Sequence, residues 1–461
     1  MVQKTASKNI YVGSGISKED DPFKAGKASA EMALKELNGI KPTFGLVFCS
    51  GSKYGKNDKT AEDLAKGVAS ALSNVPWAGC TTAGEIYNGR LESMSCTCLL
   101  ISSEFMQVGI GVGKGVHKDA KHAGKTAAEK ALENIKLERV VNPYLKFTAQ
   151  KTKNAKELIK MYDYSFLLFS SGITLEHTGM EDQVIKGMQQ VLGKQYPIIG
   201  GTSADDFRML TNYQFANGEF FSDSAVAVAI STGLRCGFGY DHGYVPTGKT
   251  TLVTKSEGYL VHELDNKKAL ERYAELLEIK PNELWDSKSK FFTKNMSLAG
   301  IASKYFSMTI NPKMIPFLST VTINPFGVVD VNGNIAIRIA KGVVGDSVEF
   351  TQEIPPNIIL SALKIDPKKV LDAEKNALQQ AVDEADANPA IVFIFDCELR
   401  KIYTGEDKIQ EAISGLGKKY PNARIFGFNT MGEYTFSRTS EQNAGSATVS
   451  VGVISNKLVS E

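Results

Sequence analysis

TFGLVFCS at 43–50 and VPWAGCTTAGEI at 75–86 form one pattern that occurs twice more in the chain, and this pattern decides the fold. Each copy contains an apolar strand, an amphipathic helix, a second short strand and a turn of small polar residues that ends in an acid. The other copies are YSFLLFSS with IIGGTSADDF, at 164–171 and 198–207, and AIVFIFDC with IFGFNTMGEY, at 390–397 and 425–434. A glycine precedes the acid by six residues in every copy, giving the pairs Gly79 and Glu85, Gly200 and Asp206, and Gly427 and Glu433. A repeat of this length is a structural unit, so three copies of one architecture are predicted.

The strands of the repeat predict mixed sheets. The first strand of each copy is a continuous apolar run, as is typical of central strands covered on both faces, and a helix between two such strands implies a parallel crossover. The strands that follow the turns, at 95–102, 224–231 and 446–455, partly alternate and are expected to pair antiparallel. Asn-Gly pairs at 88–89 and 217–218 predict tight hairpins. The predicted fold is α/β, with internally duplicated mixed sheets, parallel strand–helix–strand crossovers and antiparallel hairpins.

A second repeat shows how the chain is divided. AGKASAEMAL at 25–34 closely matches AGKTAAEKAL at 123–132, so the first half is predicted to be a tandem duplication with units at about 10–106 and 107–234. The pattern breaks around 241–249, where we place the connection between two lobes, at 1–245 and 246–461.

The bulk composition excludes several classes of protein. With 461 residues, 43% of them hydrophobic, and a formal charge of +2, the chain resembles a globular protein with no strong attraction for nucleic acid or anionic membranes. The N-terminus lacks a basic start followed by an apolar segment, and no apolar run approaches the length of a membrane span. The six cysteines lie mostly in strand-like runs, which fits reduced thiols. We therefore expect a cytoplasmic protein.

The polar turns are the candidate binding residues. Each turn offers hydroxyls or amides, backbone N–H groups and a carboxylate at the carboxyl ends of the predicted strands. Hydroxyls and N–H groups can bind a carboxylate while an acid binds an ammonium, so a small polar ligand is predicted. Alternatively, the acids only cap backbone donors within strand-to-strand turns. The candidates are Cys80, Thr81, Thr82, Glu85, Thr202, Ser203, Asp205, Asp206, Arg208, Asn429, Thr430 and Glu433.

Other motifs favour neither a nucleotide nor a metal. GYVPTGKT at 243–250 matches the phosphate-loop pattern, but a β-branched run follows it where that loop requires a helix. The five histidines are scattered and no metal-ligand spacing occurs, so neither a metal nor another cofactor is predicted. Two further alternatives stay open. One is a thiol-dependent transferase or hydrolase using Cys80 with His177 or another base, and the other is an interaction scaffold without a ligand.

At these stretches the chain resembles the FIST family, whose two parts are the FIST N and FIST C domains. Besides the three turns, the match includes FANGEFFSDSAVAVAI at 215–230, VTKSEGYLVHELDNKKALERY at 253–273 and NPFGVVDVNGNIAIR at 324–338. The resemblance implies a FIST N domain at 1–245, a FIST C domain at 246–461, and a module that senses small molecules such as amino acids. It also implies an unidentified signalling protein as partner, since no kinase, cyclase or F-box segment is recognised here. Residues 280–319 form a longer segment than is usual for the family.

Overall fold

The computed structural model describes residues 8–135, 164–174, 176–177, 179–206, 208–286, 291–292, 324–330, 332–437, 440–445 and 447–459. Most of the segment 280–319, expected to be longer than usual for the family, lies outside these residues. The predicted α/β fold with mixed sheets is confirmed. No described helix is long and apolar enough to cross a membrane.

The body of the molecule consists of three units in which the strands and the long helices follow in the same order. Unit 1 comprises β1 (Tyr11–Ser17), α1 (Pro22–Glu36), β2 (Phe44–Ser50), α2 (Gly51–Tyr54), α3 (Asp58–Leu72), β3 (Trp77–Thr82), β4 (Glu85–Tyr87), β5 (Arg90–Glu92) and β6 (Cys96–Ser102). Unit 2 comprises β7 (Met106–Lys114), α4 (Val116–Asn134), β8 (Ser165–Ser170), α7 (Glu181–Leu192), β9 (Ile198–Thr202), β10 (Gln214–Ala216), β11 (Glu219–Phe221) and β12 (Ser224–Thr232). Unit 3 comprises β13 (Leu234–His242), α12 (Pro367–Ala385), β24 (Pro389–Cys397), α13 (Glu398–Thr404), α14 (Glu406–Lys419), β25 (Arg424–Thr430), β26 (Glu433–Ser437), β27 (Ser440–Gly445) and β28 (Thr448–Leu458).

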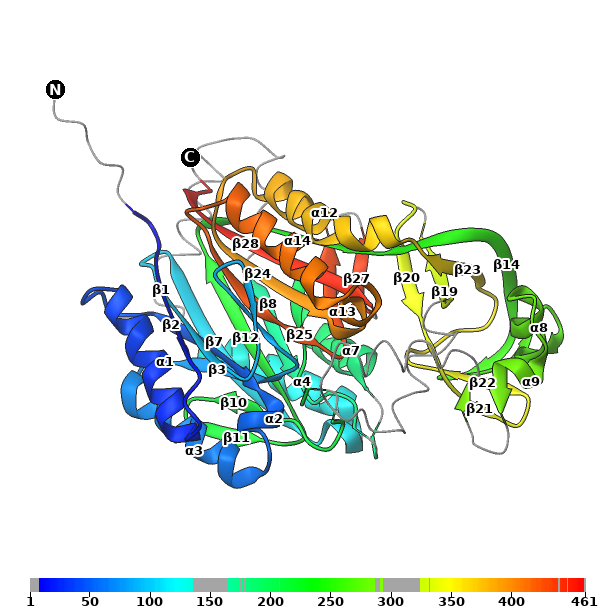
Figure 1. Cartoon of the computed structure of the whole chain (residues 1–461), viewed down its shortest axis with the longest axis horizontal. Helices are drawn as coiled ribbons and strands as arrows, with labels where there is room; N and C mark the ends of the chain where they lie inside the picture. Colours follow the sequence, from blue (N-terminus) through cyan, green and yellow to red (C-terminus); the bar gives the residue numbers. More distant parts are fainter. Residues whose placement is uncertain are drawn as a thin grey trace.

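Unit 3 is interrupted by a lobe between its first strand and its first helix. The inserted lobe contains β14 (Tyr244–Glu257), β15 (Leu260–Leu264), β16 (Lys267–Lys268), α8 (Ala269–Leu276), α9 (Pro281–Leu284), β17 (Trp285–Asp286), β18 (Phe291–Phe292), β19 (Phe326–Val329), β20 (Ile335–Arg338), β21 (Ala340–Val344), β22 (Ser347–Phe350) and β23 (Ile359–Ile365). Figure 1 shows this lobe to the right of the three-unit body, with the long strand β14 leading into it. The N–H of Asp366 donates to the carbonyl of Gly243 at 2.7 Å, so the two ends of the insertion meet. Strand β13 therefore precedes the predicted boundary at 245/246 but pairs with β28, which follows it.

The three units exchange their hairpins in a cycle. Hairpin β4–β5 of unit 1 extends the sheet of unit 3 through β25, and β10–β11 of unit 2 extends the sheet of unit 1 through β3. Hairpin β26–β27 of unit 3 extends the sheet of unit 2 through β9. Each unit therefore completes the sheet of another unit. The sheet of unit 3 is complete only with the hairpin of unit 1.

The three sheets share one apolar core. Phe48, Phe169 and Phe395 hold the same position in the three units, and each is fully buried. Their ring centroids lie 5.3 Å, 6.4 Å and 6.2 Å apart for the pairs 48–169, 48–395 and 169–395. Edge-to-face contacts at these separations are favourable. The repeated phenylalanine therefore marks the place where the three units meet.

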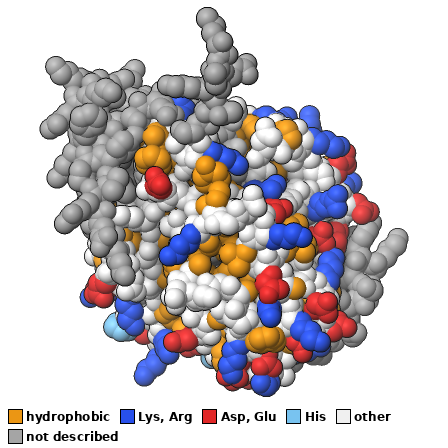
Figure 2. Space-filling model, turned by 90° about the vertical axis from the view of Figure 1, so that its left-hand side faces the viewer, with side chains coloured by type: hydrophobic (Ala, Val, Ile, Leu, Met, Phe, Trp, Pro, Cys, Tyr) orange, Lys and Arg blue, Asp and Glu red, His pale blue; other side chains and the backbone are white. Residues whose placement is uncertain are grey.

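The surface on the side away from the inserted lobe carries charges of both signs. Figure 2 shows this face, on which Lys and Arg side chains are interspersed with Asp and Glu, and hydrophobic side chains lie between them. Basic groups form no continuous patch on this face, which agrees with the formal charge of only +2.

The repeated glycine is required by the close approach of two parallel strands. A Cβ at Gly79 would lie 1.7 Å from the carbonyl oxygen of Val47, and a Cβ at Gly427 would lie 1.7 Å from that of Ile394. These obstacles are backbone atoms of the paired strand, so they cannot move aside without disturbing the sheet.

We expect Gly79→Ala to lower the free energy of unfolding by about 1–3 kcal/mol, as overpacking does in other cores. Gly415→Ala is the matched control, because a Cβ added to Gly415 on α14 would have no atom within 4 Å, and alanine favours a helix. Denaturant unfolding of both variants measures the difference. Equal stability of the two variants would contradict the steric explanation.

Candidate functional site

The structure brings the three predicted turns together at the carboxyl ends of the parallel strand pairs. Turn 1 (82–85) and turn 3 (430–433) are joined because the Ala83 N–H donates to the Asn429 carbonyl at 3.1 Å and the Asn429 N–H donates to the Gly84 carbonyl at 2.8 Å. Turn 2 (203–213) joins turn 1 through the Ala204 N–H, which donates to the carbonyl of Thr81 at 2.9 Å. Residues far apart in sequence thus form one polar cluster.

Most of the predicted binding residues are fully enclosed in this cluster. Residues without exposed surface are Cys80, Thr81, Thr82, Glu85, Thr202, Ser203, Asn429, Thr430 and Glu433. Several of their hydroxyls are used internally: Ser203 Oγ donates to the Ser170 carbonyl at 3.0 Å, and Thr430 Oγ1 donates to the Thr202 carbonyl at 3.0 Å. These contacts fasten the turns to one another. A role of these residues in ligand binding stays a prediction.

Two of the repeated acids cap the strands that follow them. Glu85 accepts from Thr82 Oγ1 at 2.5 Å, from the Ser95 N–H at 3.3 Å and from Ser95 Oγ. Glu433 accepts from the N–H and Oγ1 of Thr448 at 3.1 and 2.8 Å. Burial raises the pKa of both carboxyls to about 8. These acids therefore do what the alternative interpretation of the turns predicted, which is to bind backbone donors.

The acid of the second copy is not the structural equivalent of the other two. The residue after the repeated glycine is Cys80, Gly201 or Phe428 in the three copies, and each pairs with a hairpin of another unit. Phe428 pairs with Glu85, Gly201 pairs with Glu433, and Cys80 pairs with Gln214. Gln214 Oε1 accepts from the Ser224 N–H at 3.1 Å, as the two glutamates do from Ser95 and Thr448. The equivalence drawn between Asp206 and the glutamates is thus wrong, because turn 2 contains extra residues before Gln214.

Asp205 and Asp206 organise the longer turn 2. Asp205 accepts from the N–H groups of Met209, Leu210 and Thr211 at 2.7, 2.8 and 3.2 Å. Asp206 accepts from Ser50 Oγ and the Ser52 N–H, both at 2.8 Å. Asp205 therefore fixes the backbone within turn 2, and Asp206 fastens this turn to the start of α2. Arg208 is half-buried and forms no ion pair with an acid among the described residues.

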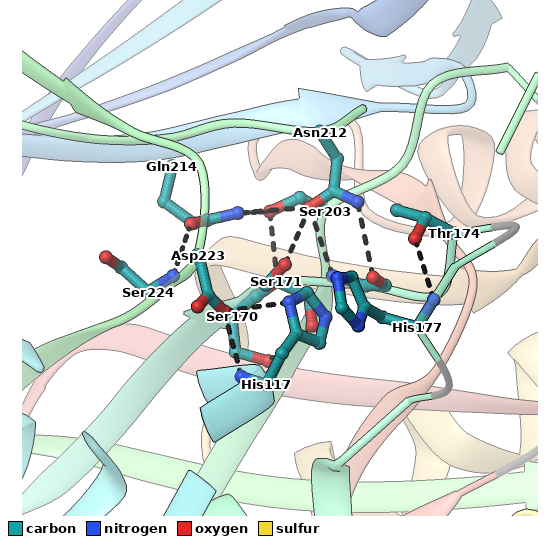
Figure 3. Close-up of polar contacts among 11 residues, drawn as sticks. His117, Ser170, Ser171, Thr174, His177, Ser203, Asn212, Gln214, Asp223 and Ser224 are labelled. Carbon is teal, nitrogen blue, oxygen red and sulfur yellow. Dashed lines mark hydrogen bonds and ion pairs between the residues drawn. The ribbon is translucent and has the colours of Figure 1, made fainter. Parts of the chain in front are cut away.

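Cys80 lies in an environment that disfavours a thiolate. Its side chain is fully buried, and burial raises the pKa of the thiol well above its ordinary value. His177, the base suggested for it, is exposed and stacks on His117 with ring centroids 4.1 Å apart, while His117 Nδ1 lies 2.9 Å from Asp223. Figure 3 shows the two imidazoles side by side, below a network that includes Asn212, Gln214 and Ser203. A reactive thiolate at Cys80 is physically disfavoured.

Unit 3 holds a group of buried charges that the sequence analysis missed. Arg400 Nε lies 2.6 Å from Asp396 Oδ1 and its Nη2 lies 2.7 Å from Glu374 Oε1, and none of the three is more than 1% exposed. Lys401 lies 2.9 Å from Glu398 and donates to the carbonyl of Ala83 in turn 1 at 3.2 Å. The signal in the sequence is DCELRK at 396–401, a charged run directly after an apolar strand.

A large cavity lies elsewhere, between unit 3 and the inserted lobe. This interlobe cleft has a volume of about 890 Å³. Unit 3 contributes β13, one face of α12 and Ser437 to its walls, and the lobe contributes Tyr244, Pro246 and residues 333–335. None of the predicted binding residues lines it. Sequence reasoning missed it because β13 and α12 are separated by the whole insertion. No group of three His, Cys, Asp or Glu side chains suited to a metal occurs in the part of the chain that the structure describes.

The comparison with family models agrees with this architecture. The FIST N domain model matches residues 43–267, and the FIST C domain model matches residues 269–435. The chain therefore belongs to the FIST family, whose domains are associated with sensing in signal transduction.

Known relatives and structures add little about function. The uncharacterized protein MJ1623 of Methanocaldococcus jannaschii is 28% identical over 326 residues, which cover 70% of this chain and 54% of the relative, so the chain spans about half the length of that relative. The cyanuric acid hydrolase of A. caulinodans has 12% identity and a TM-score of 0.26, covering 49% of this chain and 72% of that one. A second cyanuric acid hydrolase structure has 10% identity and a TM-score of 0.26, covering 50% and 70%. Likenesses this weak carry no argument here.

Proposed function

We propose that the chain is a cytoplasmic sensory protein that binds a small polar ligand, such as an amino acid, in the interlobe cleft. The observation that carries the proposal is the cleft itself. Its volume of about 890 Å³ falls within the range of small-molecule sites, and it lies between unit 3 and a lobe that has a hydrophobic core of its own. Membership of a family associated with sensing supports the same conclusion.

The lining of the cleft suits a ligand that carries charge. Phe238, Tyr240 and Tyr244 supply aromatic surface, while Asp372 and Lys369 supply groups of both signs. Such a set can contact an aliphatic body and orient an ammonium and a carboxylate. No reaction is proposed.

Movement of the inserted lobe is the proposed output. The lobe contacts α7 of unit 2 through polar groups: Tyr259 Oη donates to Asp182 Oδ1 at 2.8 Å, and Gln183 Nε2 donates to Glu353 Oε1 at 2.6 Å. Polar contacts of this kind permit relative motion at α7. Ile337, Ile339 and Leu363 of the lobe share a buried apolar cluster with Cys397 and Ala447 of unit 3, and the proposed movement pivots there. A ligand that contacts both walls would favour the closed arrangement, which an unidentified signalling protein would recognise.

Ligand binding can be tested by a thermal-shift screen of the twenty amino acids, followed by calorimetry on any that raise the melting temperature. Binding to the native state alone raises that temperature. Asn376→Trp would place a bulky ring in the cleft, so we expect it to abolish the shift. Lys375→Trp is the control, because Lys375 is exposed on the same helix but does not line the cleft.

Three outcomes are informative. A shift that is lost in Asn376→Trp and kept in Lys375→Trp supports the proposal. A shift that both variants keep shows that the ligand binds outside the interlobe cleft, which contradicts the proposed site. A screen without any shift contradicts the sensing of amino acids.

A further inference from the structure

The interlobe cleft carries more negative than positive charge. Its lining includes five carboxylates, those of Asp241, Asp366, Asp372, Asp383 and Glu384, against the two amines of Lys368 and Lys369. Among the described residues, no Lys or Arg forms an ion pair with Asp241, Asp366, Asp372 or Asp383. With His242 neutral, the lining carries three more negative than positive side chains, an excess that attracts cations.

These charges follow the length of α12. Lys368 and Lys369 stand at its first turn, whereas Asp372 and Asp383 lie farther along the same face, eleven positions apart. At a rise of 1.5 Å per residue this separation corresponds to about 16 Å. A compact ligand with one positive group could reach only one of the two. An elongated ligand with separated positive groups could reach both.

Aromatic side chains beside these acids offer a surface for the apolar part of such a ligand. Phe238 and Tyr240 of β13 and Tyr244 of β14 line the cleft, and all three rings are largely buried. Methylene groups pack against aromatic faces, and an ammonium group above such a face gains a further attraction. Carboxylates and aromatic rings that line the same cleft fit an aliphatic amine.

The other two units supply an internal comparison. A Cβ at Gly15, Gly111 or Gly239 would meet the carbonyl of Ser29, Ala127 or Ala377, which aligns α1, α4 and α12 residue by residue. The position of Asp372 is then held by Lys24 in α1 and His122 in α4, and the position of Asp383 by Lys35 and Glu133. Acids at both positions therefore occur only in the unit that forms the cleft, so the common frame does not require them.

We propose that the ligand of the interlobe cleft is an extended aliphatic amine with at least two protonated nitrogens. This assignment rests on the proposed function and narrows its ligand class. A free polyamine could span both acids, whereas a basic amino acid, whose α-ammonium and side-chain cation lie closer together, would reach one of them. In a basic amino acid Lys368 and Lys369 would bind the α-carboxylate, whereas a polyamine would not use them.

Calorimetry on the full chain distinguishes these sources. The probes are spermidine, putrescine, lysine and arginine, with butylamine, leucine and glutamate as comparisons. We expect the best dication or polycation to bind at least tenfold more tightly than butylamine, leucine or glutamate, and to weaken as salt is raised. Lys368→Gln with Lys369→Gln should weaken lysine or arginine but not spermidine.

The acids are tested by Asp372→Asn combined with Asp383→Asn, for which we expect at least a tenfold loss of affinity. Asp407→Asn is the control, since Asp407 is exposed on α14 and does not line the cleft. If leucine or glutamate binds in the cleft and no polycation does, the ligand class is wrong while the sensor proposal stands. If polycations bind but the double variant keeps its affinity, the attraction is unspecific and the inference is wrong. If nothing binds, both proposals are wrong.

Discussion

Replacing Arg400 by methionine is expected to lower the free energy of unfolding by about 3–5 kcal/mol, because removal of one partner leaves buried charges without compensation. Arg400 contacts Asp396 at 2.6 Å and Glu374 at 2.7 Å, and its Nη2 also donates to the carbonyl of Val370 at 2.8 Å. Burial alone would lower the pKa of Arg400, but the two carboxylates raise it above the ordinary value. The guanidinium therefore stays charged and links α12 to the end of β24.

The loss of stability in Arg400→Met should come from the two buried carboxylates that no longer have a counter-charge, and not from lost packing. Arg400→Met combined with Glu374→Gln and Asp396→Asn removes all three charges and should recover most of the lost stability, as replacement of buried ion pairs by neutral residues does elsewhere. Denaturant unfolding of the single and triple variants at pH 7 measures this. If Arg400→Met itself does not fold, Arg400→Lys keeps the positive charge but loses the paired contacts of the guanidinium, and it should be destabilised less. A loss below about 1 kcal/mol in Arg400→Met would show that the carboxyls are already neutral.

The sequence predicts the strands and helices of the three units because each of them produces a local pattern of apolar residues. The apolar runs that end at Phe48, Phe169 and Phe395 and the helices between strands have periods that depend only on neighbouring residues. Exchange of the hairpins leaves no local signal, since β4 has the same composition whether it pairs with its own unit or with β25. The third occurrence of the first strand, β13, is likewise separated from α12 by the inserted lobe.

The candidate site shows where sequence spacing misleads. Asp206 stands six residues after its glycine, as Glu85 and Glu433 do, yet Gln214 occupies their place in the sheets. A better guide was the Asn-Gly pair that follows: Glu85 stands three residues before Asn88, and Gln214 stands three residues before Asn217. Turn chemistry fixes the hairpin and so the register, whereas distance from the preceding strand changes with every insertion.

The equivalence of Gln214 with Glu85 and Glu433 leads to a prediction about pH. Burial, the largest cause, raises the pKa of Glu85 and of Glu433 from 4.5 to about 8. A carboxyl with a raised pKa binds its proton more tightly in the folded state than in the unfolded state. The contribution of these two carboxyls to stability is therefore greatest below the unfolded pKa, falls as pH rises from about 4.5, and levels off above about 8. Each pKa unit corresponds to about 1.4 kcal/mol, so these two groups give a fall of several kcal/mol.

Glutamine should remove this dependence, because the second copy already uses it. Gln214 Nε2 donates to Ser203 Oγ at 2.9 Å while its Oε1 accepts from the Ser224 N–H, and Glu85 makes the matching contacts with Thr82 and Ser95. Glu85→Gln with Glu433→Gln should thus be close to wild type in stability at pH 5 and more stable than wild type at pH 9. Denaturant unfolding at both pH values gives the comparison.

Two controls separate charge from shape. Glu85→Ala removes the cap as well as the charge, so it should lose stability at pH 5, where the glutamine variant does not, by about 1–3 kcal/mol for the donors left unsatisfied. Gln214→Glu places a third carboxyl in the corresponding position and should steepen the fall of stability between pH 5 and 9. A wild-type protein whose stability rises over this interval, with glutamine variants that follow it, would show that neither glutamate takes up a proton on folding. The caps would then be charged, and the hydroxyls of Thr82, Ser95 and Thr448 would be what makes a buried carboxylate tolerable at the junction of the three units.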